Sequence, residues 1–565
     1  MSGAPVRTIC PDRRTVVKTR TGGTMTSYTG AFSLEIPDLW KNHENCAFRI
    51  LYGLVQRPNS LVVRWRDREI TAELLAELIL NAAETFLQCG AGPREAIAVL
   101  ASSNHPAMLV CRYAAHLIGA SVVYVRAANP RTDAEMLSRQ VQSRILEEVG
   151  ARVLVVDASH IDRGRALVAS ATTLLTLVTE TYPAVPLDTG RTPRLPDLPP
   201  YDGDARALVT FTSGSTGQPK SLSQSYRTWN ATVRGFSGRT DTHLPSRILA
   251  VTPVSHTVGF MVDSVLAAGG SAVLHEGFDA GTVLSDVARH RITDTYLAVP
   301  HLYRLVEHED LPRTDVSSLR RLIYSGTPAA PRRIAQAVPC FRDAIVQLYG
   351  TTEAGGISSL TPLDHQEPEL LPTVGRPFPW VQVRMCDPDT GAEVERGHVG
   401  EVWTYSTTVM DGYLETGVPT HSTLRDGWLR TGDLGYWDQY GYLRLVGRVG
   451  QVIKAGGQKV YPTAVESALQ EHPDVRHAVV FGVHDRDRIE HVHAAVVLAP
   501  GSSVTDEELS RHVAATLDSA HAPAHFSRWA EIPLTAYGKP DRASLRSRAE
   551  REALGGGTVQ RGRAL

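Results

Sequence analysis

Short apolar segments alternate with helix-forming segments along much of this chain, and the alternation limits the folds that it can adopt. Residues 97–100, 121–125 and 152–156 are apolar enough to be buried strands. Between them, residues 107–118 and 134–149 have helical periodicity. Strands that alternate with helices form parallel sheets, because each helix carries the chain back across the sheet. The pattern predicts an α/β fold whose large N-terminal domain contains doubly wound sheets.

The pattern changes in the second half of the chain. Residues 381–385 and 400–404 have the character of short strands, separated by a turn at 387–391, which predicts a β-rich subdomain. After Arg448 the chain continues for about 100 residues with a helix and strands of its own, a suitable size for a separate α+β domain. We therefore expect an N-terminal domain at 31–448 and a C-terminal domain at 449–550, with a disordered tail at 551–565.

The first 30 residues form a basic arm with a single acidic residue, Asp12. Transit peptides have this composition, but a disordered arm, or a segment before a true start at Met25, is the preferred interpretation.

The composition excludes several classes of protein. Lys and Arg number 58 against 60 Asp and Glu, so no global charge favours nucleic acid or an anionic membrane. No run of eighteen apolar residues predicts a membrane span, and no apolar signal core follows the start. The six cysteines lack metal-ligand spacing. We expect a cytoplasmic protein, either a monomer or a homodimer.

A glycine- and hydroxyl-rich segment follows the apolar strand at 207–211. It contains two glycines that allow backbone N–H groups to face an anion, four hydroxyl side chains and a terminal lysine. This composition predicts a polyphosphate site, although the Gly-Lys-Ser/Thr ending of a Walker loop is missing. The alternative is a flexible surface loop. The expected phosphate-binding residues are Thr212, Ser213, Gly214, Ser215, Thr216, Gly217 and Lys220.

This segment resembles the signature loop of the adenylate-forming superfamily, which includes acyl-CoA ligases, adenylation domains of peptide synthetases and luciferases. Four further segments resemble the family's adenine and magnesium, ribose, hinge and C-terminal lysine segments, in the family's order. They are 349–353, 428–433, 447–457 and 538–539. Five ordered matches are very improbable by chance, so the chain is identified as a member of this superfamily.

The resemblance implies a role for each matching residue. Glu353 is expected to bind magnesium, Thr352 to contact the α-phosphate, and Lys539 to be the catalytic lysine of adenylation. Without the family context, Glu353 would be a solvated surface residue, and an aspartate beside glycine most often stabilises a turn. The other expected nucleotide-binding residues are Gly326, Thr327, Tyr349, Gly350, Thr351, Asp433 and Arg448.

The family's C-terminal domain rotates between its two half-reactions. The hinge residue, usually Asp or Lys, is Gly450 here. Lys454 and Gly457 match the segment that lines the pantetheine tunnel of acyl-CoA ligases, so ATP, Mg²⁺ and coenzyme A are the expected cofactors, and coenzyme A is the preferred acceptor. An acyl carrier protein or a nitrogen nucleophile is the alternative acceptor, and a catalytically silent nucleotide-binding homologue is the alternative of another class.

The acid substrate is expected to bind between three segments. Small residues near the site favour an aryl or bulky apolar acid. Asp263 is considered either as a partner for an amino group or as a solvated helix residue, and His256 either as a gate of the pocket or as a structural histidine. His484, His491 and His493 are considered as a metal cluster, which the family lacks. The expected pocket residues are His256, Val258, Gly259, Asp263, Ser325 and Gly355.

Overall fold

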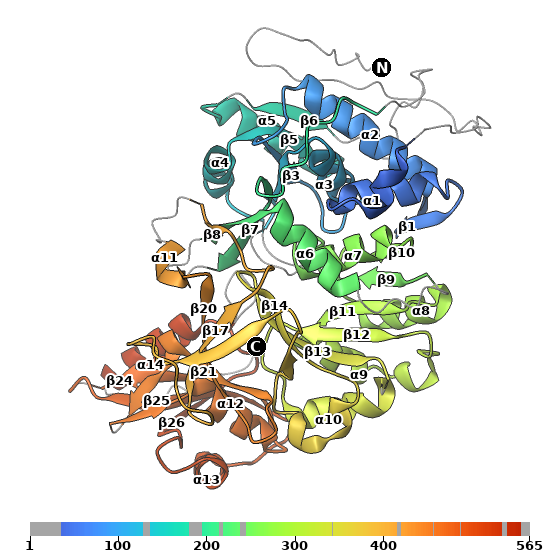
Figure 1. The fold of residues 1–565 in the computed structure, drawn as a ribbon. Helices are drawn as coiled ribbons and strands as arrows, with labels where there is room; N and C mark the ends of the chain where they lie inside the picture. Colours follow the sequence, from blue (N-terminus) through green and yellow to red (C-terminus); the bar gives the residue numbers. More distant parts are fainter. Residues whose placement is uncertain are drawn as a thin grey trace, which may run out of the picture.

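The computed structural model describes most of the chain, and Figure 1 shows its arrangement. The described residues are 36–127, 136–173, 175–179, 195–213, 219–237, 245–341, 343–414, 420–455, 457–485, 487–533 and 540–554.

The first sheet has seven described strands in the order β18-β8-β7-β4-β3-β5-β6. Its central strands are parallel, and every residue of β3 and β4 is buried, as continuous apolar runs in a covered parallel sheet should be. The strands are β3 (Ala96–Leu100), β4 (Ser121–Tyr124), β5 (Ala151–Val156), β6 (Thr176–Thr179), β7 (Arg206–Ser213), β8 (Pro219–Ser225) and β18 (Gly412–Tyr413). Helix α2 (Ala72–Gln88) precedes β3. The helices between the strands are α3 (Ala107–Leu117), α4 (Arg139–Glu148), η2 (Ala158–His160) and α5 (Ile161–Ser170).

Helix α4 is shorter than the sequence pattern predicted. It begins at Arg139 because the Ser138 side chain accepts a hydrogen bond from the backbone N of Val141, which caps the helix there.

The second sheet has nine described strands in the order β15-β14-β13-β12-β11-β9-β10-β1-β2. The strands are β1 (Leu61–Trp65), β2 (Arg68–Thr71), β9 (Arg247–Ala250), β10 (Ser271–Leu274), β11 (Asp294–Ala298), β12 (Arg321–Ser325), β13 (Ile345–Thr351), β14 (Gly355–Leu360) and β15 (Arg376–Pro377). Its helices are η1 (Asp38–Asn42), α1 (Cys46–Val55), α6 (Tyr226–Ser237), α7 (Thr257–Ala267), α8 (Ala280–His290), α9 (Val299–Val306), η3 (Leu311–Arg313), α10 (Pro331–Phe341), η4 (Asp364–Gln366) and η5 (Pro368–Leu370).

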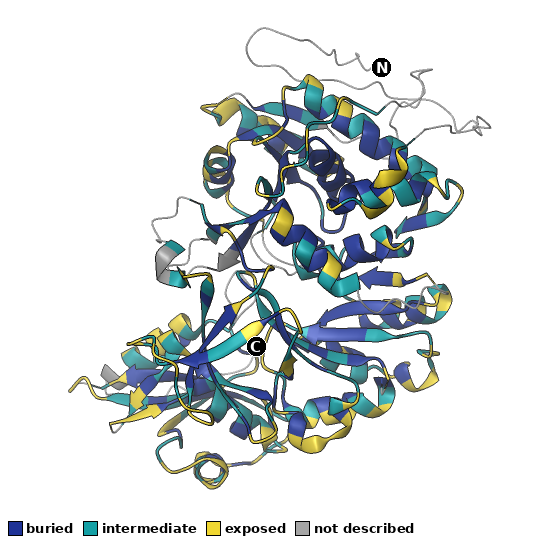
Figure 2. Ribbon diagram, in the orientation of Figure 1, coloured by how far each residue is buried: buried dark blue, intermediate teal, exposed yellow. Residues whose placement is uncertain are grey.

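One hydrophobic core joins the two sheets. It includes side chains from β3 and β4 of the first sheet, from β9 and β11 of the second, and from helices α1, α3, α6 and α7. Figure 2 shows this interior in dark blue, with exposed residues on the outer helices, the loops and the outer strands. All eleven residues of α3 are buried, so the polar residues of this helix must find partners inside the protein.

The β-rich subdomain follows, with β16 (Gln382–Cys386), β17 (Gly400–Tyr405), α11 (Thr420–Thr423), β19 (Leu424–Arg425), β20 (Trp428–Trp437) and β21 (Leu443–Arg448). The C-terminal part has its own core and comprises η6 (Val449–Gln451), β22 (Ile453–Ala455), β23 (Gln458–Val460), α12 (Pro462–Glu471), β24 (Val475–His484), β25 (Glu490–Leu498), α13 (Asp506–Thr516), β26 (His525–Arg528) and α14 (Arg542–Leu554). The predicted α/β class, with a large N-terminal and a small C-terminal domain, is confirmed.

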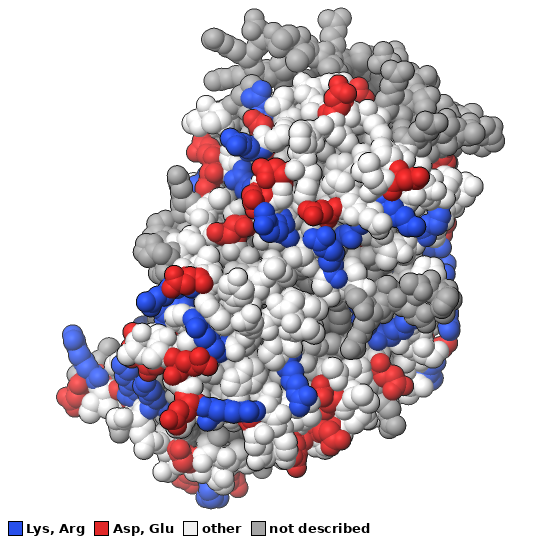
Figure 3. Space-filling model, in the orientation of Figure 1, with Lys and Arg blue, Asp and Glu red and all other residues white. Residues whose placement is uncertain are grey.

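Acidic and basic side chains are interspersed on the face shown in Figure 3. Among the described residues, no helix is both long and apolar enough to cross a membrane.

Candidate active site

A tyrosine, an aspartate and an arginine from three strands meet where β13 ends. The Tyr349 hydroxyl donates a hydrogen bond to Asp433 Oδ2 at 2.8 Å. Arg448 Nε donates to Asp433 Oδ1, also at 2.8 Å. The register of β20 and β21 fixes this contact, because Asp433 and Arg448 lie opposite each other. Each carboxylate oxygen has two lone pairs, so Asp433 can accept further hydrogen bonds from a ligand.

The charges of this cluster are set by mutual contact and by burial. The Asp433 carboxylate is the main cause of a raised pKa for Arg448, and burial followed by the Asp433 charge raises the pKa of Tyr349 well above its usual value. Both partners therefore remain protonated donors at neutral pH. The Arg448 side chain is 51% exposed against 10% for Asp433, so the cluster lies at an open edge of the protein.

The turn between β13 and β14 carries the expected magnesium ligand. It is unusually tight, because a Cβ atom on Gly350 would lie 2.1 Å from the carbonyl oxygen of Gly355. The Thr351 hydroxyl accepts a hydrogen bond from the backbone N of Ala354 at 3.0 Å and closes the turn. Thr352 is exposed and Glu353 is half-buried, so both are accessible to a ligand.

Tyr413 links Glu353 to the phosphate-loop hairpin. Its hydroxyl donates to Glu353 Oε1 at 3.1 Å, and Lys220 Nζ lies 5.6 Å from the centre of its ring. Burial and the nearby Glu353 charge raise the pKa of Tyr413, so its phenol stays neutral. Carboxylate oxygens are the ligands that Mg²⁺ prefers, and Glu353 therefore fits the expected ion.

For several predicted phosphate-loop residues and for Lys539, the structure describes only the backbone or nothing. Thr212 and Ser213 are the last residues of β7, and their backbone pairs with β8, but their side chains are not described. Gly214, Ser215, Thr216, Gly217 and Lys539 lie outside the described residues, so their expected roles stay predictions.

His256 immediately precedes α7 at the edge of the expected acid pocket. Its Nδ1 lies 2.8 Å from Ser255 Oγ, whereas its buried Nε2 contacts no hydrogen-bond partner among the described residues. Burial lowers the pKa of His256 to about 4, so the ring is neutral at physiological pH. Val258 is fully buried, and Gly259 is required for close packing, because a Cβ atom there would lie 2.1 Å from the Val254 carbonyl oxygen.

Asp263 is neither a solvated helix residue nor an open partner for an amine. It is fully buried, and its carboxylate accepts hydrogen bonds from Arg112, Tyr113 and Trp229. The sequence pattern missed this because the partners lie on α3 and α6, far away in the chain. The expectation of a solvated or free Asp263 is therefore corrected.

The ends of β11 and β12 contribute further polar groups near His256. Burial raises the pKa of Tyr296, and the side chains of Ser325 and Thr257 act on its hydroxyl in the opposite direction. Ser325 is half-buried, while Gly326 and Thr327 after it are exposed. Gly326 has φ +100°, a conformation that favours glycine. Gly355 likewise has φ +72°, and a Cβ atom there would press on Thr408.

The hinge and tunnel segments lie directly after Arg448. Gly450 belongs to η6, Lys454 is exposed on β22, and Gly457 forms the turn to β23 with φ +80°. A Cβ atom on Gly450 would meet no atom within 4 Å.

The C-terminal histidines His484, His491 and His493 are not grouped as metal ligands in the structure. In the part of the chain that the structure describes, no group of three or more metal-ligating side chains is suitably placed. His491 Nε2 contacts Asp485 at 2.8 Å, while His493 packs beside His525 with ring centres 4.6 Å apart.

Sequence reasoning missed two side chains of this region. Tyr413 lies on a two-residue strand, and Tyr296 lies within a buried strand, so neither has a local sequence signal. Only the sheet pairings bring them to the site.

Two family models match this chain. The one described as AMP-binding enzyme matches residues 54–414, and the one described as AMP-binding enzyme C-terminal domain matches residues 464–539.

Individual proteins are similar over nearly the whole length. The medium/long-chain-fatty-acid–CoA ligase FadD8 of Mycobacterium tuberculosis is 30% identical, with 88% of this chain and 89% of the relative covered. A feruloyl-CoA synthase of an Amycolatopsis species is 32% identical, with 87% and 96% covered. The solved amide bond synthetase McbA of Marinactinospora thermotolerans has a TM-score of 0.79 and 35% identity, with 90% of this chain and 99% of that chain covered.

Proposed function

This chain belongs to the AMP-binding enzyme family, within the adenylate-forming superfamily, and from this premise we propose that it is an acyl-CoA ligase for an aryl or bulky apolar acid. In the first half-reaction, a carboxylate oxygen attacks the α-phosphorus of ATP, and the bond to the β-phosphate oxygen breaks to release pyrophosphate. In the second, the thiol sulfur of coenzyme A attacks the acyl carbon, loses its proton, and AMP leaves.

The observation that carries the proposal is the convergence of Tyr349, Asp433 and Arg448 beside Glu353. Asp433 already aligns two donors and keeps free lone pairs, so it suits the two ribose hydroxyls of a nucleotide. The Arg448 side chain is about half exposed, and its Nη donors suit a phosphate group. Glu353 supplies an anionic oxygen for Mg²⁺, which would offset the negative charge of the triphosphate.

The remaining roles concern positioning and charge. Lys220 enters from β8 on the same side as Glu353, since both approach Tyr413, and adds a positive charge for the phosphates. Lys539 would bridge the carboxylate and the α-phosphate as negative charge develops there. Neutral His256 would form one side of the acid pocket.

Coenzyme A is the first candidate acceptor because Lys454 and Gly457 match the tunnel segment of acyl-CoA ligases, and relatives over nearly the full length are named as such ligases. An amine is the second candidate. It is favoured by the 35% identity to a solved amide bond synthetase, which exceeds the 30% and 32% identities to the two CoA ligases.

The test is acid-dependent exchange of labelled pyrophosphate into ATP across aryl, medium-chain and amino acids. Exchange with an aryl acid is expected, and no exchange with any member despite ATP binding would overturn the proposal in favour of a silent homologue. Product analysis with coenzyme A alone, and separately with a panel of amines, then distinguishes the two acceptors. An amide formed without coenzyme A, with no thioester in its presence, would select the second candidate.

A further inference from the structure

A completely buried ion pair lies behind the expected acid pocket. Arg112 on α3 and Asp263 on α7 both have side chains with 0% exposure, and Arg112 Nη2 lies 2.5 Å from Asp263 Oδ1. Helix α3 is otherwise mainly apolar, so the arginine is placed in an environment that disfavours charge.

The aspartate end of this pair accepts three hydrogen bonds from the protein itself. The Tyr113 hydroxyl donates to Asp263 Oδ1 at 2.7 Å, and Trp229 Nε1 donates to Oδ2 at 3.2 Å. The rings of Tyr113 and Trp229 also lie 5.6 Å from the Arg112 guanidinium carbon. Asp263 therefore holds the guanidinium in place and has no evident role toward a ligand.

The arginine end acts on the backbone that carries His256. Arg112 Nη1 donates to the Val254 carbonyl oxygen at 2.9 Å, and Nη2 lies 3.4 Å from the Gly259 carbonyl oxygen. These carbonyls stand on either side of His256 and Thr257 in the chain. Because a guanidinium is a rigid planar fork, one side chain fixes both ends of the segment Val254–Gly259, the turn that leads into the first residues of α7.

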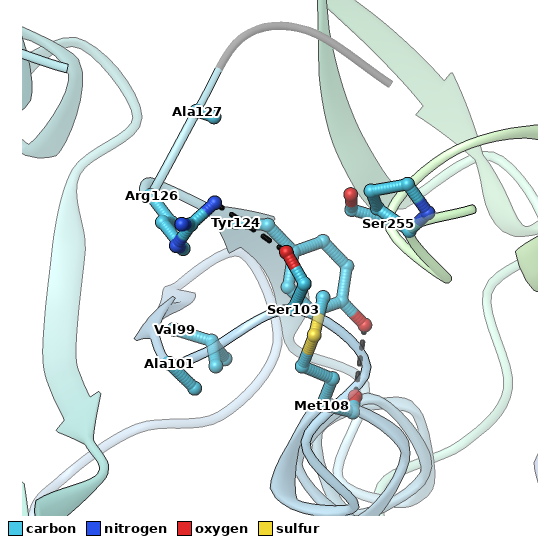
Figure 4. A pocket seen from close by; sticks show the side chains of 9 residues that line it. Val99, Ala101, Ser103, Met108, Tyr124, Arg126, Ala127 and Ser255 are labelled. Carbon is cyan, nitrogen blue, oxygen red and sulfur yellow. Dashed lines mark hydrogen bonds between the residues drawn. The ribbon is translucent and has the colours of Figure 1, made fainter. Parts of the chain in front are cut away.

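One side of this turn is not closely packed. A cavity lies beside it, lined by Ser255 of the turn, by Pro253 directly before it, and by Met108 and Tyr124 of the first sheet region. Figure 4 shows Ser255 across this cavity from Ser103 and Arg126. The Tyr124 hydroxyl on the far wall accepts a hydrogen bond from Arg112 and donates to the Met108 carbonyl oxygen, so the same arginine spans both walls.

We propose that Arg112, held by Asp263, is a positioning residue of the acid site, which fixes the Val254–Gly259 turn and thereby the placement of His256 and Thr257 against the substrate. Burying an ion pair is a weak source of stability, because desolvation offsets most of the attraction, and apolar replacements are often neutral or stabilising. Arg112 Nε is moreover buried without a hydrogen-bond partner among the described residues. The pair thus serves geometry rather than stability. This inference rests on the proposed acid-activating function.

The test replaces the pair with apolar side chains in the double variant Arg112→Met/Asp263→Leu and measures pyrophosphate exchange in the full-length protein. We expect a melting temperature within a few degrees of the parent's or above it, an acid KM raised at least about fivefold, and an ATP KM within about twofold of the parent's. The ratio of kcat/KM between two aryl acids of different size should also change. Arg112→Lys keeps the charge but not the fork, and should show a smaller rise in acid KM.

The matched control is Arg321→Met/Asp294→Leu, which removes another largely buried ion pair. This pair lies at the amino-terminal ends of β11 and β12, at the other end of these strands from Ser325. It should leave the acid KM and the selectivity between acids unchanged. Unchanged acid KM and selectivity in the Arg112 double variant would overturn the inference. So would its failure to fold, because the pair would then be needed for stability.

Amide hydrogen exchange provides a readout that does not depend on activity. Residues 254–259 should exchange faster in the Arg112 double variant than in the parent, and at the parent rate in the control. If the parent shows no acid-dependent exchange of pyrophosphate, the proposed function fails. Hydrogen exchange then still tests whether Arg112 fixes the turn, and unchanged protection there would contradict that role.

Discussion

Two aspartate–arginine pairs, one in each half of the proposed site, differ in what surrounds them. Asp433 and Arg448 meet at an open edge, with 10% and 51% exposed side chains, whereas Asp263 and Arg112 are completely enclosed. The first pair keeps hydrogen-bonding capacity for a ligand. The second pair makes its hydrogen bonds to the protein's own backbone and side chains. Under the proposed function, the same two residue types therefore bind a ligand in one place and position the backbone in the other, and burial decides which.

If charged side chains contact the reactants only on the nucleotide side, the largest loss of activity should come from replacing Lys539, the lysine expected to approach the reacting atoms. Lys539→Ala should lower acid-dependent pyrophosphate exchange about 100- to 1,000-fold, because a charge positioned for the transition state is lost. The fold should remain intact by circular dichroism. Lys454→Ala is the control, since its expected role concerns only the second half-reaction. An exchange rate equal to the parent's in Lys539→Ala would remove this residue from the mechanism.

The exposed pair should act on ATP and not on the acid. Asp433→Asn loses the charge that faces Arg448 and an acceptor for ribose, so we expect the ATP KM to rise about 30-fold, equivalent to about 2 kcal/mol. The acid KM should change little, the opposite of the result expected for the Arg112 pair. Asp438→Asn is the matched control, because Asp438 pairs with Arg444 in the next turn of the same hairpin. Equal effects of the two variants would mean that Asp433 supports only the hairpin.

A smaller effect is expected at Gly450, where a substitution should slow one half-reaction more than the other. Gly450→Pro restricts the backbone directly after Arg448, so acyl transfer to coenzyme A should slow about tenfold while pyrophosphate exchange stays within about twofold. Gly450→Ala is the control, because a Cβ atom there meets no neighbour within 4 Å. Equal losses in both half-reactions would contradict a hinge role. Both rates are measured on the same preparations.

The smallest effect concerns the neutral histidine of the acid side. Burial lowers the pKa of His256 to about 4 from an unfolded value of 6.5. Above pH 6.5 the ring is neutral in both states and pH has no effect through it. As pH falls from 6.5 toward 4, the unfolded state binds a proton that the folded state does not, so stability decreases. His256→Asn should make the fall in melting temperature over this range shallower by a few degrees.

The exposed His398→Asn should reproduce the parent's decrease over the same pH range. A His256→Asn variant with the parent's pH dependence would show that this ring titrates equally in both states.

The nucleotide half of the site could be anticipated from the chain because its residues occur in short local segments. Tyr349 to Glu353 are consecutive, and the segment that contains Asp433 precedes Arg448 on the next strand, so one hairpin register brings the two together. The alternation of strands and helices likewise predicted the fold class, since backbone periodicity is a local property. The boundary of α4 was predicted too early, because the pattern did not indicate the cap at Ser138.

The acid half depended on contacts between distant residues. Asp263 and Arg112 are separated by 151 residues, so nothing near Asp263 indicates that its charge is neutralised. The nucleotide half also contains one such contact, because Tyr413 reaches Glu353 across 60 residues. By itself, the sequence determined the fold class and the order of the nucleotide segments, because these arise from neighbouring residues. Only the tertiary structure decided which charges face a ligand and which are buried, because burial and pairing depend on how α3, α6 and α7 pack between the two sheets.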